Sequence, residues 1–492
     1  MPSLYGIIKD NNWCSDEEFL YGNYYKNYRI LYDGEIYNSV EIKQELIEKG
    51  YKFLTYLEEE VVLNAYIEWG EKCLDKFNGI FFIAIWNVSK KVLFLARDFV
   101  GVKPVYYTKL ESGIIFSNRV KNIFEKSSIT HTSTYDKIFD LFVFDTINID
   151  ENMVFNNIKT LLPGSFLIYD GSVKISSYKS DEESKTRDVD LNSIVNIRNI
   201  ISESVIRQTI PETEVFVNLF GSNTNALIAI LVSEILKEYN KKLTTVISNE
   251  SESISRIVKN YNIENVKTDI YFDINNVYKM LRIKEFPDIF NSYMYYLSLE
   301  KMKNYKNICI TGDYSEYIFG SFKKKTFNKR LFLLNDGFVK NINKEFLIED
   351  FFARRNRKSF KYNYVISNLL ESREKLAASF NVSMRNPIYS KELIEYIEKL
   401  NQEQMSMNML YKAFHEFINI ENTYLPRHNT PKDYGEYENM IRSEYIHVLD
   451  NPTSRIHEII DKEKAIALNN VKIMKFIVEF NFWLKYYNVE IL

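Results

Sequence analysis

The sequence predicts two differently built parts: an α+β layered domain of antiparallel strands and helices, then an α/β domain with a parallel sheet that ends in a mostly helical part. Three observations predict this fold. Apolar runs and Asp-Gly turns fill the first third of the 492 residues, short buried strands alternate with helices after residue 190, and the residues from 331 on favour helices. The polar stretch 179–190 lacks periodicity, so we expect domains over residues 1–180 and 191–492.

In the first domain, apolar runs next to turn signals predict strands, and helix-like stretches lie between them. Asp33-Gly34 and Asp170-Gly171 each follow an apolar run. Because glycine accepts a positive φ, we expect a turn at both places. Helices are expected over residues 39–49 and 59–69. Strands are expected over residues 28–32, 80–86, 92–96, 105–108, 113–117 and 165–169.

The second domain shows helices that alternate with short apolar strands. Helices are expected over residues 191–208 and 225–237. Strands are expected over residues 214–219, 243–247 and 307–311. Strands joined through helices favour a parallel sheet, whose ligand sites lie at the carboxyl ends of the strands.

Composition limits the classes of function. With 63 basic and 66 acidic side chains the formal net charge is −3, so the chain lacks the large positive field expected for nucleic acid or an anionic membrane. Cys14, Cys73 and Cys309 are too few and too scattered for a disulfide framework or a closed zinc site. We expect a soluble cytoplasmic protein, since no basic leader or apolar run long enough for a bilayer is present.

The charged and aromatic strings of the first domain form an ordered series. It begins with YDGEIYN at 32–38 and continues through ARD at 96–98 to GVKPVYY at 101–107. Taken alone, Arg97-Asp98 and Lys103-Pro104 fit either an active-site cluster or an ion pair that fixes a turn. In this order the strings resemble the asparagine synthetase B family. The resemblance implies an Ntn-type class II glutamine amidotransferase domain followed by an ATP-pyrophosphatase-like synthetase domain.

The resemblance also implies that glutamine hydrolysis is lost. In the family, a cysteine at position 2 is the nucleophile, whereas Pro2 offers neither a thiolate nor a primary amine. Asp33-Gly34-Glu35 stands for the family's Asn-Gly-Glu, and a carboxylate at the first position would repel the developing oxyanion. Glu58 corresponds to the Asp that holds the glutamine α-amino group. We expect a vestigial glutamine site, as in the β-lactam synthetase and lasso-peptide cyclase branches.

A weakened ATP site is implied in the second domain. The family's Ser-Gly-Gly-x-Asp-Ser loop holds pyrophosphate at a helix N-terminus and magnesium on its Asp, and it corresponds to FGSNTN at 220–225. Thr224 falls on the Asp position and carries no charge for the metal. A capped helix start explains the same stretch equally well. The implied ATP-binding residues are Leu219, Gly221, Ser222, Asn223, Thr224, Asn225, Ile247, Thr311 and Gly312.

A second loop is better preserved. The string TGDYSEYIFGS at 311–321 resembles the family's Ser-Gly-(Asp or Glu)-Gly-x-Asp-Glu-x-Phe-Gly-Gly. Asp313 falls where some relatives carry a carboxylate implicated in deprotonating the amine, and Glu316 falls on a magnesium ligand. Lys432 aligns with a lysine that stabilises adenylation, although a solvated surface lysine explains it as well. Lys284 and Ser383 replace family carboxylates.

Two functions stay open. The first is an ATP- and Mg²⁺-dependent enzyme that adenylates a small-molecule or peptide carboxylate and lets an amine attack it, without glutamine hydrolysis, in natural-product or peptide tailoring. The second is a catalytically inactive pseudoenzyme that serves as a scaffold or regulates a partner protein. Five residues that depart from the family favour it: Pro2, Phe220, Thr224, Lys284 and Ser383. Neither function involves nucleic acid or a membrane, and a homodimer is compatible with both.

Overall fold

The structure is a computed structural model. It describes residues 4–10, 12–14, 27–145, 147, 150–179, 187–209, 214–219, 223–247, 252–268, 271–288, 292–304, 307–319, 329–355, 365–401, 404–415 and 434–492.

The N-terminal part contains two five-stranded antiparallel sheets packed face to face. The first has the order β2 (Asn12–Cys14), β1 (Tyr5–Lys9), β7 (Gly113–Ser117), β6 (Tyr106–Leu110) and β9 (Lys159–Thr160). The second has the order β11 (Val173–Ser177), β10 (Ser165–Tyr169), β5 (Val92–Arg97), β4 (Gly79–Asn87) and β3 (Tyr28–Ile36). Ile8 and Phe116 of the first sheet share a core with Phe82 and Trp86 of the second. The apolar face of each sheet is thereby buried against the other.

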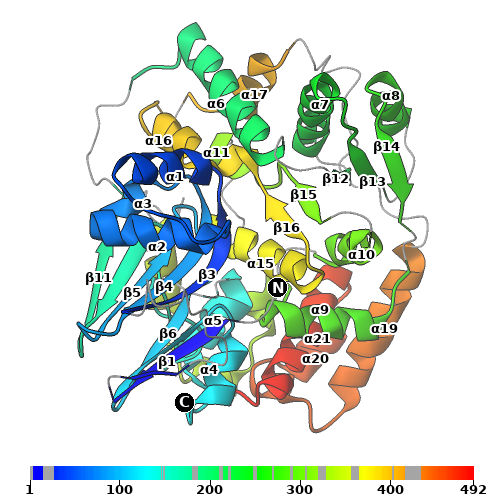
Figure 1. The fold of residues 1–492 in the computed structure, drawn as a ribbon. Coiled ribbons are helices and arrows are strands. Elements are labelled where there is room, and N and C mark those ends of the chain that lie inside the picture. The colour runs from blue at the N-terminus through cyan, green and yellow to red at the C-terminus, as the bar shows by residue number, and fades with distance from the viewer. Residues whose placement is uncertain are drawn as a thin grey trace.

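Helices cover the outer faces of this sandwich. Figure 1 shows α1 (Ser39–Glu48), α2 (Glu58–Trp69) and α3 (Cys73–Lys76) beside the sheet that contains β3, β4 and β5. Leu46 and Val62 of these helices pack against Phe81 and Ile83 of β4. Because β4 is covered on both faces, nearly all its residues are buried and its sequence reads as a continuous apolar run. On the other sheet, α4 (Val120–Lys126) and α5 (Tyr135–Phe144) contribute to a core with Ile115.

One expected turn is wrong. Asp33-Gly34 lies inside β3, which pairs with β4 without interruption from Tyr28 to Ile36. A Cβ at Gly34 would lie 2.4 Å from the carbonyl oxygen of Ile80, so this glycine permits the close approach of two strands rather than a reversal of the chain. The second Asp-Gly prediction is confirmed, because Gly171 has φ +102° in the hairpin between β10 and β11.

The middle of the chain forms a parallel five-stranded sheet, as expected. Its order is β14 (Glu264–Lys267), β13 (Thr244–Ile247), β12 (Val215–Asn218), β15 (Ile308–Ile310) and β16 (Ser383–Arg385). The associated helices are α6 (Leu191–Thr209), α7 (Asn223–Glu238), α8 (Glu252–Asn260), α9 (Ile274–Lys284), α10 (Tyr293–Met302), α11 (Glu316–Phe319) and α15 (Val365–Ser379). Every residue of β12 and β13 is buried, as in a sheet covered on both faces.

The described residues after 329 are mostly helical. The helices are α12 (Asp336–Val339), α13 (Lys344–Arg355), α16 (Lys391–Glu398), α17 (Met407–Ala413), α19 (Tyr434–Asp450), α20 (Lys462–Ile466) and α21 (Val471–Tyr486), with short 3-10 turns between some of them. The last strand, β17 (Glu490–Ile491), returns to pair in parallel with β8 (Thr132–Ser133). None of the described helices is long and apolar enough to cross a membrane.

The two parts share apolar cores. Phe142 of α5 packs in one cluster with Phe480 of α21, and Phe99 and Val102 belong to the cluster that surrounds the parallel sheet. The boundary at 180–190 stays a prediction, since residues 180–186 lie outside the described part of the chain.

Candidate functional site

The candidate nucleotide site lies at the carboxyl ends of three parallel strands. Leu219 follows β12, Ile247 ends β13 and Thr311 follows β15, so the structure brings these expected residues to one edge of the sheet. The backbone N–H of Leu219 donates to Val246 at 2.9 Å, and that of Thr311 donates to Arg385 at 2.9 Å. Leu219, Ile247 and Thr311 are buried. Each loop therefore leaves the sheet in a fixed position.

Asn225, in the first turn of α7, ties the two predicted loops together. Its side-chain Nδ2 donates to Asp313 Oδ1 at 2.7 Å, and its Oδ1 accepts the backbone N–H of Gly312 at 2.7 Å. The hydroxyl of Thr311 donates to the same Oδ1 at 3.3 Å. Asn225 and Asp313 are 88 positions apart in the sequence, and the sequence motifs do not predict this contact.

Thr224 closes the space beside this contact. The hydroxyl of Ser315 donates to Thr224 Oγ1 at 2.8 Å, and both residues are buried. A Cβ placed on Gly312 would lie 2.7 Å from Thr224 Cγ2, so the threonine methyl fills the space over this glycine. Position 224 thus offers a neutral hydroxyl that is already hydrogen-bonded, which suits a packed loop contact better than a magnesium ligand.

Arg373 of α15 contacts both Asp313 and Tyr314. Arg373 Nε lies 4.0 Å from Asp313 Oδ2 and donates to the Tyr314 hydroxyl at 2.9 Å. Tyr314 has φ +68°, a conformation that non-glycine residues adopt rarely, and the resemblance places a glycine at this position. Its carbonyl accepts the Tyr389 hydroxyl at 2.6 Å. Contacts to Arg373 and Tyr389 therefore stabilise a conformation that the backbone alone disfavours.

The predicted metal ligand Glu316 lies at the start of the short helix that follows this loop. Glu316 is exposed at the first residue of α11. Over the described residues, no three His, Cys, Asp or Glu side chains gather closely enough to hold a metal ion. Gly221, Ser222, Lys432 and Pro2 lie outside the described residues, so their expected roles stay predictions.

Two carboxylates of the expected vestigial glutamine site, Asp33 and Glu35, form ion pairs at the boundary with the second domain. Asp33 Oδ1 lies 2.9 Å from the Lys103 ammonium, which also contacts Glu374 of α15. All three groups are buried. One ammonium serves two carboxylates, and burial, together with the charge of Asp33, raises the pKa of Glu374 to about 7 despite Lys103. Asp33 is therefore committed to the interface between the two parts.

Glu35 also reaches the second domain. Its carboxylate accepts Arg385 Nε at 2.6 Å and the Ser383 hydroxyl at 2.6 Å, both on β16. Glu58 instead remains within the first domain, where it accepts the Tyr32 hydroxyl at 2.5 Å and the backbone N–H of Ile36 at 2.9 Å. Burial raises the pKa of the Glu58 carboxyl, although these hydrogen bonds oppose the effect.

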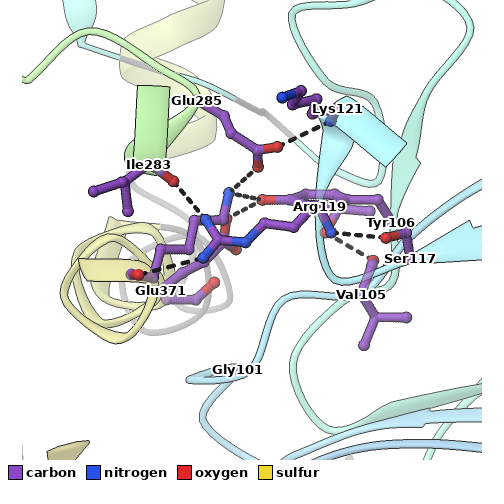
Figure 2. A network of polar contacts seen from close by, with 12 residues as sticks. Gly101, Val105, Tyr106, Ser117, Arg119, Lys121, Ile283, Glu285 and Glu371 are labelled. Carbon is purple, nitrogen blue, oxygen red and sulfur yellow. Dashed lines mark hydrogen bonds and ion pairs between the residues drawn. The ribbon is translucent and has the colours of Figure 1, made fainter. Parts of the chain in front are cut away.

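A second buried network joins the two parts nearby (Figure 2). Glu285, after α9, accepts the backbone N–H of Lys121 and the Lys375 ammonium, both at 2.9 Å. Arg119 points its guanidinium at the carbonyls of Ile283 and Lys375. Glu371 Oε2 lies 2.9 Å from Arg97 and its other oxygen 3.2 Å from Lys375. Except for Glu371 and Lys375, which lie four positions apart on α15, these partners are distant in sequence.

The turn-fixing interpretation of Arg97-Asp98 and Lys103 is the one that the structure supports. Asp98 accepts the backbone N–H groups of residues 100–103, at 2.6 to 3.2 Å, and so closes a buried turn. Arg97 and Lys103 extend from that turn to Glu371 and Glu374 of α15. These residues build an interface and not a catalytic cluster.

Comparison with known proteins places this architecture in a family. Residues 21–179 match the family described as a glutamine amidotransferase domain. The chain is 24% identical over 503 residues to the glutamine-hydrolysing asparagine synthetase 3 of Bacillus subtilis (strain 168), covering 90% of this chain and 81% of that protein. The chain is therefore similar to asparagine synthetases over most of its length.

Other asparagine synthetases match shorter stretches. Asparagine synthetase 1 of the same Bacillus subtilis strain is 40% identical over 98 residues, which is 20% of this chain and 16% of that protein. A putative asparagine synthetase 1 of Methanocaldococcus jannaschii is 33% identical over 140 residues, or 28% of this chain and 23% of that protein. The family resemblance drawn from the motifs is thereby confirmed. The names of these relatives describe glutamine hydrolysis in those proteins.

Proposed function

We propose that this asparagine synthetase relative forms an amide bond from a small-molecule or peptide carboxylate and an amine, with ATP as the activating substrate and without glutamine hydrolysis. The absence of glutamine hydrolysis is supported by two sets of contacts. Asp33 pairs with Lys103, and Glu35 contacts Arg385 and Ser383. Carboxylates already paired with the cations Lys103 and Arg385 are poorly available to a glutamine ligand. Pro2 removes the nucleophile as well.

One feature of the candidate site, the N-terminus of α7, is suited to binding the phosphates of a nucleotide. The 16-residue helix α7 begins directly after the β12 loop, at the carboxyl edge of a parallel sheet, and its first backbone N–H groups attract phosphate oxygens. ATP supplies the activation of the carboxylate. Asp313 stands at the same edge, oriented by Asn225 at 2.7 Å, where its second oxygen can accept a proton from the attacking amine.

Magnesium in the family's arrangement does not fit. Thr224 is neutral and hydrogen-bonded to Ser315, and its methyl covers Gly312. We therefore assign no step to a metal held at position 224. A nucleotide bound here depends on the helix N-terminus and on Asn225 for its placement.

The hydrogen bond between Ser315 and Thr224 favours a second candidate function. If the link between Thr224 and Ser315 keeps the two loops closed, the chain is a pseudoenzyme that serves as a scaffold or binds a catalytic partner. The two candidates differ in one measurable property, which is nucleotide binding.

Calorimetry of the full chain with ATP, in the presence and absence of magnesium, separates them. The enzyme proposal expects binding at millimolar nucleotide or tighter, weakened in Asn225→Ala. No heat of binding at millimolar ATP would contradict the enzyme and support the scaffold. An assay of glutamate release from glutamine should show none, and thiol-dependent release would contradict the proposed loss of glutamine hydrolysis.

A further inference from the structure

Glu35 is placed to act on the synthetase loop across the boundary between the two parts. It lies in β3 of the N-terminal sandwich, and its carboxylate contacts two residues of β16, the edge strand of the parallel sheet. The contact with Arg385 spans 350 positions of sequence. Nothing else in the vestigial glutamine site reaches this strand among the contacts described above.

Strand β16 and the residues after it hold the 311–314 loop at three points. The carbonyl of Arg385 accepts the backbone N–H of Thr311 at 2.9 Å. Asn386 Nδ2 donates to the carbonyl of Asp313 at 3.1 Å, and the Tyr389 hydroxyl donates to the carbonyl of Tyr314 at 2.6 Å. The loop that carries Asp313 thus takes its position from β16.

Glu35 is a charged partner of the buried Arg385. Arg385 is 6% exposed, and its Nη1 donates to the carbonyl of Gln208 at 2.6 Å. A carboxylate beside a guanidinium this buried offsets part of the cost of burying its charge. Loss of the Glu35 charge should weaken the hold on Arg385 and on the strand that contains it.

We propose that Glu35 is a positioning residue for Asp313: a side chain of the vestigial glutamine site that fixes the synthetase loop through Arg385, Ser383 and β16. The N-terminal domain is then retained because it completes the second site. This inference rests on the proposed function only in treating the 311–314 loop as part of the working site. The contacts themselves are independent of any substrate.

Hydrogen exchange of the full-length protein tests the proposal without a known substrate. In Glu35→Gln, which keeps the shape and removes the charge, the amides of Thr311 and Gly312 should exchange about tenfold faster or more. Exchange in β13 should be unchanged, whereas general destabilisation would raise both. Glu35→Asp, which keeps the charge, should restore at least part of the protection.

Asn78→Ala is the matched control. Asn78 Nδ2 donates across the same boundary to Glu392 of α16 at 2.6 Å, so this variant removes an interdomain hydrogen bond that does not touch β16. The proposal is overturned if Glu35→Gln and Asn78→Ala give the same exchange around residue 311, or if Glu35→Gln leaves it at the wild-type rate. Should Glu35→Gln not fold, Ser383→Ala gives the same readout through the other contact of Glu35.

A separate measurement keeps the two proposals distinguishable. Calorimetry with ATP reports on the proposed function, and failure of the wild-type protein to bind leaves the exchange result valid. If the wild type binds ATP, Glu35→Gln should weaken binding and Glu35→Asp should restore it. Equal ATP affinity in Glu35→Gln and wild type would contradict a positioning role.

Discussion

Asn225 is the residue on which the order of the candidate site most directly depends. Its amide uses its Nδ2 for Asp313 and its Oδ1 for Gly312, and Asn225 itself is 4% exposed. A side chain with a donor and an acceptor in fixed positions can join a carboxylate and a backbone amide at once. Threonine or serine hydroxyls are too short for both contacts.

Asn225→Ala should therefore lower the free energy of unfolding by about 2 kcal/mol, because the buried N–H of Gly312 loses its acceptor. Urea denaturation measures the change. The control is Asn196→Ala on α6, which removes an exposed hydrogen bond to Tyr396 at 3.0 Å. This variant should change the free energy of unfolding by under about 0.5 kcal/mol. Equal effects of the two variants would show that the loop contact contributes nothing particular.

Asn225→Asp tests the electrostatics of the same contact. A second carboxylate would lie within hydrogen-bonding distance of Asp313, where two like charges disfavour joint ionisation. The variant should be stable at acidic pH, when one of the pair keeps a proton, and should lose stability as the pH rises to 7. Thermal unfolding at pH 4.5 and pH 7 checks this, and a pH-independent difference from wild type would contradict it.

At the scale of elements, the pairing of β3 with β4 fixes the vestigial glutamine site. Nine residues pair in unbroken register, and this register presents Asp33 and Glu35 toward the second domain. The close approach at Gly34 is what permits it, since no Cβ fits between the strands.

Gly34→Ala should destabilise the protein by about 3 kcal/mol or more, because the added Cβ would meet backbone atoms that cannot move aside. Gly171→Ala is the control: its φ of +102° costs about 1 kcal/mol for a non-glycine residue, but nothing lies within 4 Å of the added Cβ. Chemical denaturation of both variants is the measurement. A larger loss in Gly171→Ala than in Gly34→Ala would contradict the assigned register.

At the scale of the whole molecule, buried ion pairs join two parts that differ in architecture. Buried ion pairs join Lys103, Arg97 and Lys375 to carboxylates across the boundary or beside it. Such groups make the relative placement of the two parts specific, and they make stability depend on pH.

The pKa of Glu374, raised by burial to about 7, sets the sign of that dependence. The folded state holds this proton more tightly than the unfolded state does, so the contribution is full below pH 4.5 and is lost as the pH rises to about 7. In Glu374→Gln this pH-dependent loss of stability is absent. The stability of wild type relative to Glu374→Gln should therefore fall by up to about 3 kcal/mol between pH 4.5 and 7.

Glu371→Gln tests a neighbouring carboxyl group whose contribution to stability changes with pH in the opposite direction. Burial raises the pKa of Glu371, but Lys375 and Arg97 outweigh burial and the net shift is downward. Its contribution is present above pH 4.5 and is lost as the pH falls below that value. Urea titrations from pH 3 to 8 measure both variants, and slopes of the same sign would contradict the assigned ion pairs.

The amino-acid sequence by itself determined most of the elements and named the residues in doubt. Apolar periodicity predicted the helices at 39–49 and 191–208 and the strands of both sheet types, and Pro2 and Thr224 are the residues on which the predicted losses of the nucleophile and of the metal carboxylate rest. These features are local, because backbone propensity, turn chemistry and residue identity act within a few positions of the chain.

Only the tertiary structure decided where the remaining charges go. Asp33-Gly34 reads as a turn locally but lies in a strand, because β4 supplies backbone partners along its whole length. Glu35 reads as part of a glutamine pocket, yet it pairs with Arg385, 350 positions away. Such contacts arise from the packing of distant elements around a shared core, and no spacing along the chain encodes them.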